Sequence, residues 1–459
     1  MPEIIFLGGL GVVFIILAVV YPKVLVYLIW PVLFLYPHRL TIGMLPFNIG
    51  FDDLFVVAVF LVIVVRFGVD QIDFSVKAAL AFFLVLLLAN LSWLLANYGP
   101  DQITRTLKVG LKGVVFVLAT WSFSRTLDSE QDLKRHMYAF LVGVAGGCVT
   151  ALLDSSSFPI GDWFWVPGHE REHYRATGAF LSPAGVGTNI LLPAFIAGSL
   201  ASRPGAFMSR VFMVSLCVLY TGTVLLAQSR SAWLGGVIGL FVMTFTVHRK
   251  VFAYITLAVV AAGFVLFFGD YYSDIVQDAI ASVFTPGGIS THGRLEMWRS
   301  ILDNPYLALL IFGYGQDAAI SYLGGLPHSG YFDVFYTLGL GGTIYFFVVM
   351  WKTMRTSNWL RKQDPNPFFY MSSQGIWLGL IGTLGLAVTA DPVYDSFWRY
   401  GFFFWIAWLW ARQKQLEKNG YEIPYPTKGG VYSRQCFQFH SKPRVPILSF
   451  KEWYRAIKR

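Results

Sequence analysis

The chain has 459 residues, of which 56% are apolar, 17% aromatic and only 13% charged, and its formal net charge is +9. A soluble core cannot hide that much apolar surface, so the composition excludes a soluble enzyme and predicts a polytopic membrane protein. Cys148, Cys217 and Cys436 fall in predicted spans or in the C-terminal tail, which excludes a disulfide framework in an exterior loop.

Apolar segments with few or no charges recur along the chain, most of them near the roughly 20 residues that a helix needs to cross a bilayer. The alternation typical of a β-barrel is absent, so the predicted fold class is all-α, with about 12 or 13 transmembrane helices. No cleavable signal peptide is evident, and the first segment is expected to stay. The predicted spans are 4–21, 24–36, 54–65, 76–95, 107–123, 133–153, 180–202, 211–229, 231–247, 251–269, 328–351, 375–390 and 397–410.

Lysines and arginines in the short loops predict the orientation of the chain. They gather in alternate loops, on the same side as the basic tail, and that side is predicted to be cytoplasmic. The loops 154–179 and 270–327 are then periplasmic, and the protein is expected in the inner membrane of a Gram-negative bacterium. The cations that carry this prediction are Arg125, Lys134, Arg135, Arg203, Arg210, Arg249, Lys250, Lys352, Arg355, Arg361 and Lys362.

Two domains are predicted, a transmembrane catalytic domain over 1–410 and a basic cytoplasmic tail over 411–459. The tail holds eleven Lys or Arg against three acidic residues. Such a tail is expected to lie on the anionic headgroups of membrane lipids. No nucleic acid is expected as a partner, because no nucleic-acid-binding module accompanies the charge.

Residues 169–173 read His-Glu-Arg-Glu-His, which matches the His-Glu-x-x-His pattern of zinc proteases. In those enzymes both imidazoles lie one helical turn apart and hold the metal, while the glutamate is the base. Here the segment follows Pro167-Gly168 in a short loop, which favours a solvated polar loop or contact with a polar substrate. A zinc protease built on His169 and His173 stays an alternative. Otherwise neither a metal nor a cofactor is predicted.

Four further motifs follow one another between about residues 170 and 350. They begin with Arg175-Ala-Thr-Gly178, then Ser229-Arg230-Ser-Ala-Trp233, then Gly293-Arg294-Leu-Glu-Met-Trp298 with Gly313-Tyr314-Gly315, and last His328-Ser-Gly-Tyr331 with Leu338-Gly339-Leu340-Gly341. In this order and spacing they resemble the O-antigen ligase and O-antigen polymerase superfamily. Residues 37–41 also resemble an early loop of the ligase relatives that are associated with exosortase systems. Ala184 and Ser329 depart from the family pattern, where asparagine is common.

The resemblance implies a GT-C-like membrane fold with a long periplasmic loop that carries short amphipathic helices. It also implies metal-independent transfer of an oligo- or polysaccharide from an undecaprenyl-diphosphate-linked donor to a hydroxyl of a glycan, lipid or protein acceptor. The displacement would be single and inverting. By the same resemblance His328 matches the catalytic histidine, and Arg230 and Arg294 match the arginines that bind the diphosphate.

The chemistry of these residue types agrees with such roles. Arginine stays charged and holds phosphate oxygens in pairs, and an imidazole at a membrane surface is a suitable base. Arg294 also begins a predicted amphipathic helix, whose N-terminus could add anion-binding amides. Arg175, Arg299 and Trp298 are accessory candidates, although the arginines could pair with carboxylates and the tryptophan could anchor the helix.

Purely structural roles stay open, since Arg230 could reach to lipid headgroups and His328 could cap or pack at a helix start. A flippase or exporter of lipid-linked oligosaccharides is the alternative from another functional class. Transport needs polar residues along a path at bilayer depth, whereas the notable cations of this chain gather at one face. The sequence does not decide between a ligase and a polymerase.

Overall fold

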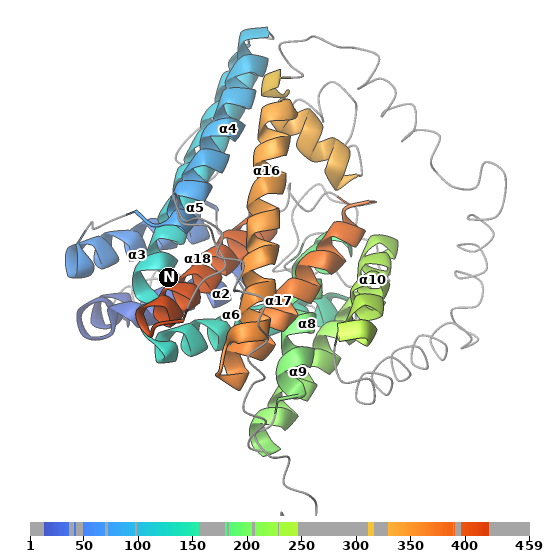
Figure 1. Ribbon diagram of the computed structural model, residues 1–459. Coiled ribbons are helices and arrows are strands. Elements are labelled where there is room, and N and C mark those ends of the chain that lie inside the picture. Colours follow the sequence, from blue (N-terminus) through green and yellow to red (C-terminus); the bar gives the residue numbers. More distant parts are fainter. Residues whose placement is uncertain are drawn as a thin grey trace, which may run out of the picture. The chain divides into compact units, whose positions relative to one another are not determined.

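In the computed structural model, the chain forms two compact units, Met1–Leu416 and Glu417–Arg459. Within the described residues the first unit is almost entirely α-helical (Figure 1), as the sequence predicts. The short strands β1 (Thr41–Ile42) and β2 (Ile49–Gly50) pair in antiparallel fashion. The structure describes residues 13–35, 41–42, 49–68, 72–96, 99–155, 180, 183–203, 207–227, 229–246, 311–315, 329–388, 390 and 396–421.

The helices coincide with the predicted spans, although α5, α16, α17 and α18 each extend well beyond the predicted bounds at one end. Each predicted span that lies in the described residues coincides with a helix, whereas 251–269 lies outside them. Residues 13–20, in the predicted span 4–21, are helical. The helices described over their full length are α2 (Pro22–Leu35), α3 (Phe51–Phe67), α4 (Phe74–Ala96), α5 (Pro100–Thr126), α6 (Glu130–Ser155), α8 (Pro183–Ala201), α9 (Phe207–Leu226), α10 (Arg230–Thr246), α16 (Gly330–Gln363), α17 (Pro367–Leu386) and α18 (Ser396–Lys418).

Among the described residues, five helices are long and apolar enough to cross a membrane. Three shorter apolar helices accompany them, Pro22–Leu35, Gly185–Ala201 and Ser231–Met243. The protein is therefore a polytopic membrane protein, while the total of 12 or 13 crossings stays a prediction. The five long segments are Phe74–Leu95, Ile103–Thr126, Glu130–Leu153, Phe207–Leu226 and Gly330–Gln363.

The helix α17 begins earlier than the sequence suggests. The predicted span starts at residue 375, but the helix starts at Pro367, after Asn366, whose side chain accepts a hydrogen bond from the amide of Phe368 at 3.0 Å. A polar run of Ser372, Ser373 and Gln374 resembles a loop in sequence, yet all three side chains are buried. Polar residues of this size are common where membrane helices pack against each other.

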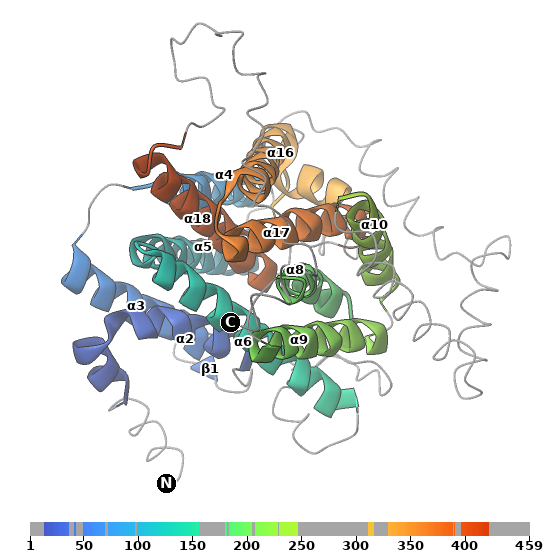
Figure 2. The same ribbon diagram turned by 60° about the horizontal axis from the view of Figure 1, so that its bottom comes forward.

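Glycines bring α8, α10 and α17 close together. A Cβ atom at Gly235 of α10 would lie 2.5 Å from the carbonyl oxygen of Gly382 in α17, and one at Gly379 would lie 2.7 Å from the side chain of Leu192 in α8. Figure 2 shows α8 between α17 and α9. Because small residues allow the backbones to approach, the relative positions of these helices leave little room for larger side chains.

Aromatic side chains fill the spaces between α2, α5, α6 and α18. The indole of Trp30 stacks on Phe123 at 5.1 Å and meets the edges of Phe140 and Phe404 at 4.8 and 5.0 Å between ring centroids. Trp30 is fully buried. The helix α18 thus packs against α2, α5 and α6 through aromatic side chains rather than through close backbone contact.

Close contacts establish which helix ends lie together. The amide of Gly330, at the start of α16, donates to the carbonyl oxygen of Ala387, just after α17, at 2.7 Å. Gly187, near the start of α8, faces both Ala232 near the start of α10 and Leu386 at the end of α17. We call this end, where α8, α10 and α16 begin and α17 ends, the site end.

The opposite helix ends carry many charges, and we call them the charged end. Lys134 near the start of α6 and Arg203 after α8 both lie over the ring of Phe368 at the start of α17, at 5.9 and 5.5 Å from its centroid. The cations of these two loops therefore share one end of the helix bundle. That arrangement agrees with the predicted loop pattern, while the compartment they face stays a prediction.

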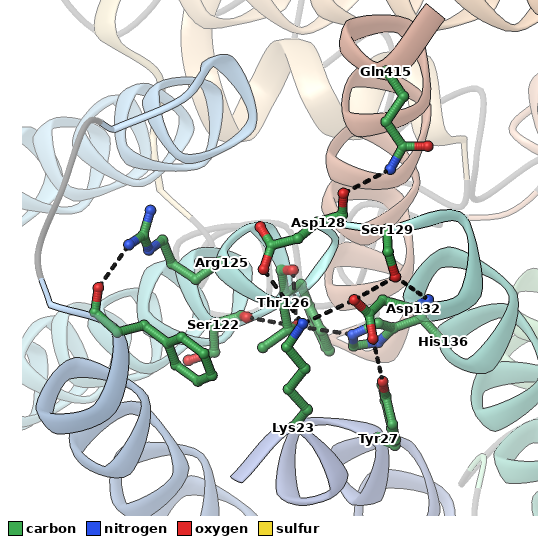
Figure 3. A network of polar contacts seen from close by, with 12 residues as sticks. Lys23, Tyr27, Ser122, Arg125, Thr126, Asp128, Ser129, Asp132, His136 and Gln415 are labelled. Carbon is green, nitrogen blue, oxygen red and sulfur yellow. Dashed lines mark hydrogen bonds and ion pairs between the residues drawn. The ribbon is translucent and has the colours of Figure 1, made fainter.

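A network of polar side chains ties α2, α5 and α6 together at the charged end (Figure 3). The ammonium group of Lys23 lies 2.8 Å from Asp132 and 3.4 Å from Asp128. Tyr27 also donates to Asp132, and the Nε2 atom of the fully buried His136 lies 2.8 Å from the hydroxyl of Thr126. The members lie in the first two turns of α2 and α6, at the end of α5 and in the short turn after it.

Arg412 fastens α18 to the same end. Its guanidinium donates to both carboxylate oxygens of Asp364 at 2.7 and 2.9 Å and to Glu130 at 2.6 Å, and it lies over the ring of Phe369. The Arg412 side chain is 2% exposed and that of Asp364 is not exposed. Burial alone would lower the pKa of Arg412, but Asp364 and Glu130 outweigh that effect and raise the pKa.

Candidate functional site

Only one of the residues predicted to form the site lies in the described part of the chain. Arg230 is the first residue of α10, and its side chain lies outside the described part. The other predicted site residues lie outside the described residues altogether. They are His328, Arg294, Arg175, Arg299 and Trp298, together with His169 and His173 of the zinc alternative.

The residues around Arg230 form a well-defined helix start. Ser229 is buried, its hydroxyl faces the amide of Ala232 at 3.5 Å, and its carbonyl oxygen accepts from the amide of Trp233 at 3.1 Å. The indole of Trp233 donates back to Val224 at 3.4 Å. A serine in this position supplies an acceptor to amides that the first helical turn leaves unpaired. The Ser229-Arg230 motif therefore marks the boundary between α9 and α10, as its polar character suggests.

The residues that follow His328 form a second helix start. Ser329 is the N-cap residue of α16, with extended backbone, and its carbonyl oxygen accepts from the amide of Asp333 at 2.8 Å. Asp333 itself is fully buried, and Thr337 donates to its carboxylate at 3.4 Å. Sequence reasoning missed Asp333. The available signal was a single acid in the first turn of an otherwise apolar segment, where the helix dipole favours negative charge.

The end of α17 lies between these two helix starts. A Cβ atom at Gly235 would lie 2.9 Å from the Cβ atom of Leu386, and the next residue, Ala387, accepts the hydrogen bond from Gly330. One helix end thus contacts the helix that begins at Arg230 and the helix that begins two residues after His328. The fold brings these two chain segments to the same end of the bundle.

Two of the sequence motifs meet in space at the site end. The amides of Tyr314 and Gly315 donate to the carbonyl oxygens of Tyr336 and Thr337, at 2.8 and 3.0 Å. The rings of Tyr314 and Tyr336 stack with centroids 4.3 Å apart. Just beyond, α16 is broken at Gly339, which has a φ of 67° and a ψ of −176°. That conformation belongs to glycine, so the Gly-Tyr-Gly and Leu-Gly-Leu-Gly motifs together build this break.

An apolar pocket lies beside the start of α16. It is bounded by α16, the end of α17 and the start of α18, and Tyr331, Leu384 and Trp398 are among the residues that line it.

The fold and the matched sequence family agree on the class of this protein. It is a multi-pass membrane protein, and residues 215–347 match the family model described as O-antigen ligase. The matched family is one of enzymes that transfer glycans. No curated protein matches the chain. The matched segment spans the positions of Arg230, Arg294 and His328, and it leaves out Arg175.

Proposed function

We propose that the protein transfers an oligo- or polysaccharide from an undecaprenyl-type diphosphate to an acceptor hydroxyl at the periplasmic face of the inner membrane. The observation that carries this proposal is the match of residues 215–347 to the O-antigen ligase family, which implies lipid-linked glycan substrates in general. The meeting of the α10 and α16 starts at the end of α17 supports it, because the arginine and histidine of the proposed site belong to those segments.

Each proposed residue has a distinct task. The acceptor oxygen attacks the anomeric carbon, the bond from that carbon to the diphosphate oxygen breaks, and His328 takes the proton of the acceptor hydroxyl. Arg230 and Arg294 hold the leaving diphosphate and stabilise the charge that develops on it. The donor is already activated, so the step is balanced without ATP or a metal. Arg175, Arg299 and Trp298 are proposed as accessory contacts to the glycan.

Tyr331 and Leu384 form an apolar surface directly next to the residues that follow His328. We place the diphosphate of the carrier at the membrane edge beside this surface. The same assignment places the basic tail, 411–459, at cytoplasmic headgroups.

A transfer assay with the purified protein tests the proposal. The donor is a glycan linked to undecaprenyl diphosphate, and separate reactions offer lipid, protein and carrier-linked acceptors. We expect His328→Ala to lower kcat by a factor of about 10²–10⁴, as loss of a general base does. We expect Arg230→Gln to lower it by about 10²–10³. Arg210→Gln is the matched control, because Arg210 is an exposed cation near the start of α9.

Three outcomes would contradict the proposal. Glycan transfer that survives in His328→Ala would show that His328 is not the general base. Movement of the carrier across the membrane without any transfer would instead indicate a flippase. Proteolytic activity that chelation removes, that zinc restores and that is absent in His169→Ala would indicate the zinc protease alternative. The acceptor that works in the assay decides between ligase and polymerase.

A further inference from the structure

In the last turn of α17, one carbonyl oxygen accepts its hydrogen bond from a side chain of another helix. The four terminal carbonyls of a helix have no partner within it and need other donors, above all where water is scarce. At Leu384 the donor is the hydroxyl of Tyr331, at 2.7 Å. The neighbouring carbonyl oxygens accept from backbone amides. The amide of Ala387 donates to Thr383, that of Val388 to Gly385 and that of Ala390 to Leu386.

Tyr331 is the second residue of α16 and lies three positions after His328. Its neighbour Gly330 makes the other bond of this junction, from its amide to the carbonyl oxygen of Ala387 at 2.7 Å. The two bonds fix the first turn of α16 against the last turn of α17 at two points. A single hydrogen bond would allow the part of α16 before Gly339 to rotate about that bond, whereas two hydrogen bonds fix the direction of this part.

The other side of the same α17 turn touches α10. A Cβ atom at Gly385 would lie 2.6 Å from the side chain of Ile238, and one at Gly235 would lie 2.9 Å from Leu386. Any shift of the α17 end therefore changes the position of the helix that begins at Arg230. The last turn of α17 is common to both helix starts.

We infer that Tyr331 is a positioning residue, whose hydroxyl holds the start of α16 in register with the end of α17 and thereby keeps His328 within reach of the diphosphate at Arg230. This inference rests on the proposed function. Small displacements of a catalytic group lower the rate strongly, because the reacting atoms must lie close and aligned. Tyr331 is 36% exposed and its ring stacks on Phe347 at 6.1 Å, so the ring keeps its packing when only the hydroxyl is removed.

The chain offers a closely matched control in the part of α16 beyond the break at Gly339. Tyr345 also belongs to α16, and its hydroxyl donates to the carbonyl oxygen of Ala78 in α4, again at 2.7 Å. Tyr331→Phe and Tyr345→Phe thus remove the same kind of bond from the two parts of α16 on either side of the break at Gly339. Only Tyr331→Phe removes it at the junction with α17.

The test measures kcat and the KM for the diphosphate-linked donor in the transfer assay, together with the melting temperature. We expect Tyr331→Phe to lower kcat about tenfold or more while the KM stays within about twofold, because binding groups are kept and alignment is lost. Tyr345→Phe should keep the wild-type kcat. Both variants should melt at similar temperatures. In the His328→Ala background, Tyr331→Phe should cause no further loss, because it acts through His328.

Wild-type kcat in Tyr331→Phe would overturn the inference, and so would an equal loss in Tyr345→Phe. A further loss on top of His328→Ala would show that Tyr331 acts by another route and would overturn it as well. The variants His328→Ala and Arg230→Gln separate failure of the positioning role from failure of the proposed function. If His328→Ala and Arg230→Gln keep full transfer, the proposed function fails, whereas if they lose it and Tyr331→Phe does not, only the positioning role fails.

Discussion

The charged end and the site end of the helix bundle are held together by different kinds of contact. At the charged end, side chains make the connections, with Arg412 bound to Asp364 and Glu130, and Lys23 bound to Asp132. At the site end, the connections described are mostly between backbone groups, as in the bond from Gly330 to Ala387. Side-chain clusters give stability with some freedom of geometry, while backbone contacts fix positions.

This difference separates stability from catalysis. An ion pair can be lost and the helices can still keep their order, provided that enough packing is left. A backbone contact through glycine has no side chain that can adapt, so a new Cβ atom must move a whole helix. Changes at the charged end should therefore act on unfolding, and changes at the site end should act on transfer. Three predictions test this contrast, in order of decreasing effect.

The largest effect is expected at Gly339. Its backbone conformation is one that only glycine adopts readily, at a cost of about 1–3 kcal/mol for other residues. A Cβ atom there would also collide with the backbone of Ile311 and Gly313. We expect Gly339→Ala to reduce transfer to background and to lower the melting temperature. Both are measured on protein purified in the same detergent.

Gly341 supplies the control for this prediction. It lies two residues further along α16, and a Cβ atom there would meet nothing nearer than the carbonyl oxygen of Ile311 at 3.8 Å. Gly341→Ala should therefore leave transfer near the wild-type rate. Wild-type transfer in Gly339→Ala would show that the break in α16 does not matter for the reaction.

A second prediction concerns Arg412 at the charged end. Removal of one partner from a buried ion pair leaves the other charge uncompensated and costs about 3–5 kcal/mol. We expect Arg412→Met to lower the free energy of unfolding by about that amount, while the folded fraction keeps its kcat. Denaturant unfolding and the transfer assay, both at a low temperature, measure the two quantities. Lys414→Met is the control, because Lys414 is exposed on the same helix.

The partner residue sharpens this prediction. Asp364 is the carboxylate that Arg412 leaves behind, and an apolar replacement of both residues removes the buried charge. Arg412→Met combined with Asp364→Leu should therefore regain part of the lost stability. A large fall in kcat of the folded Arg412→Met protein would contradict the separation between the two ends.

The sequence predicts most of this fold because the membrane leaves few options. The apolar runs had to be helices, and the loop cations marked which helix ends lie together, as Lys134 and Arg203 at Phe368 bear out. The end of α16, at Gln363 rather than 351, and the start of α17, at Pro367 rather than 375, were the main errors. The buried Ser372, Ser373 and Gln374 read as polar, and a single sequence does not indicate which polar residues face a neighbouring helix.

The candidate site was accessible to sequence reasoning only in part. Motif order indicated the family, and residues 215–347 match it. The junction between Tyr331 and Leu384 could not be predicted, because these residues are 53 positions apart along the chain and meet only through the packing of α16 against α17. Asp333 was missed for a similar reason, since burial of a carboxylate is decided by the helices around it. The roles of His328, Arg230 and Arg294 stay proposals.

The smallest effect is expected at Asn366, the N-cap of α17 at the charged end. Its side chain accepts from the amide of Phe368 at 3.0 Å and donates to Glu130 at 3.2 Å. Loss of an N-cap costs about 0.5–2 kcal/mol, so Asn366→Ala should lower the free energy of unfolding by about 1 kcal/mol without a change in kcat. Asn366→Ser keeps a capping oxygen and should recover most of the difference. If Asn366→Ala instead lowered kcat and left unfolding unchanged, the start of α17 would control the reaction from the far end of the helix, and the division between a stabilising end and a positioning end would not hold.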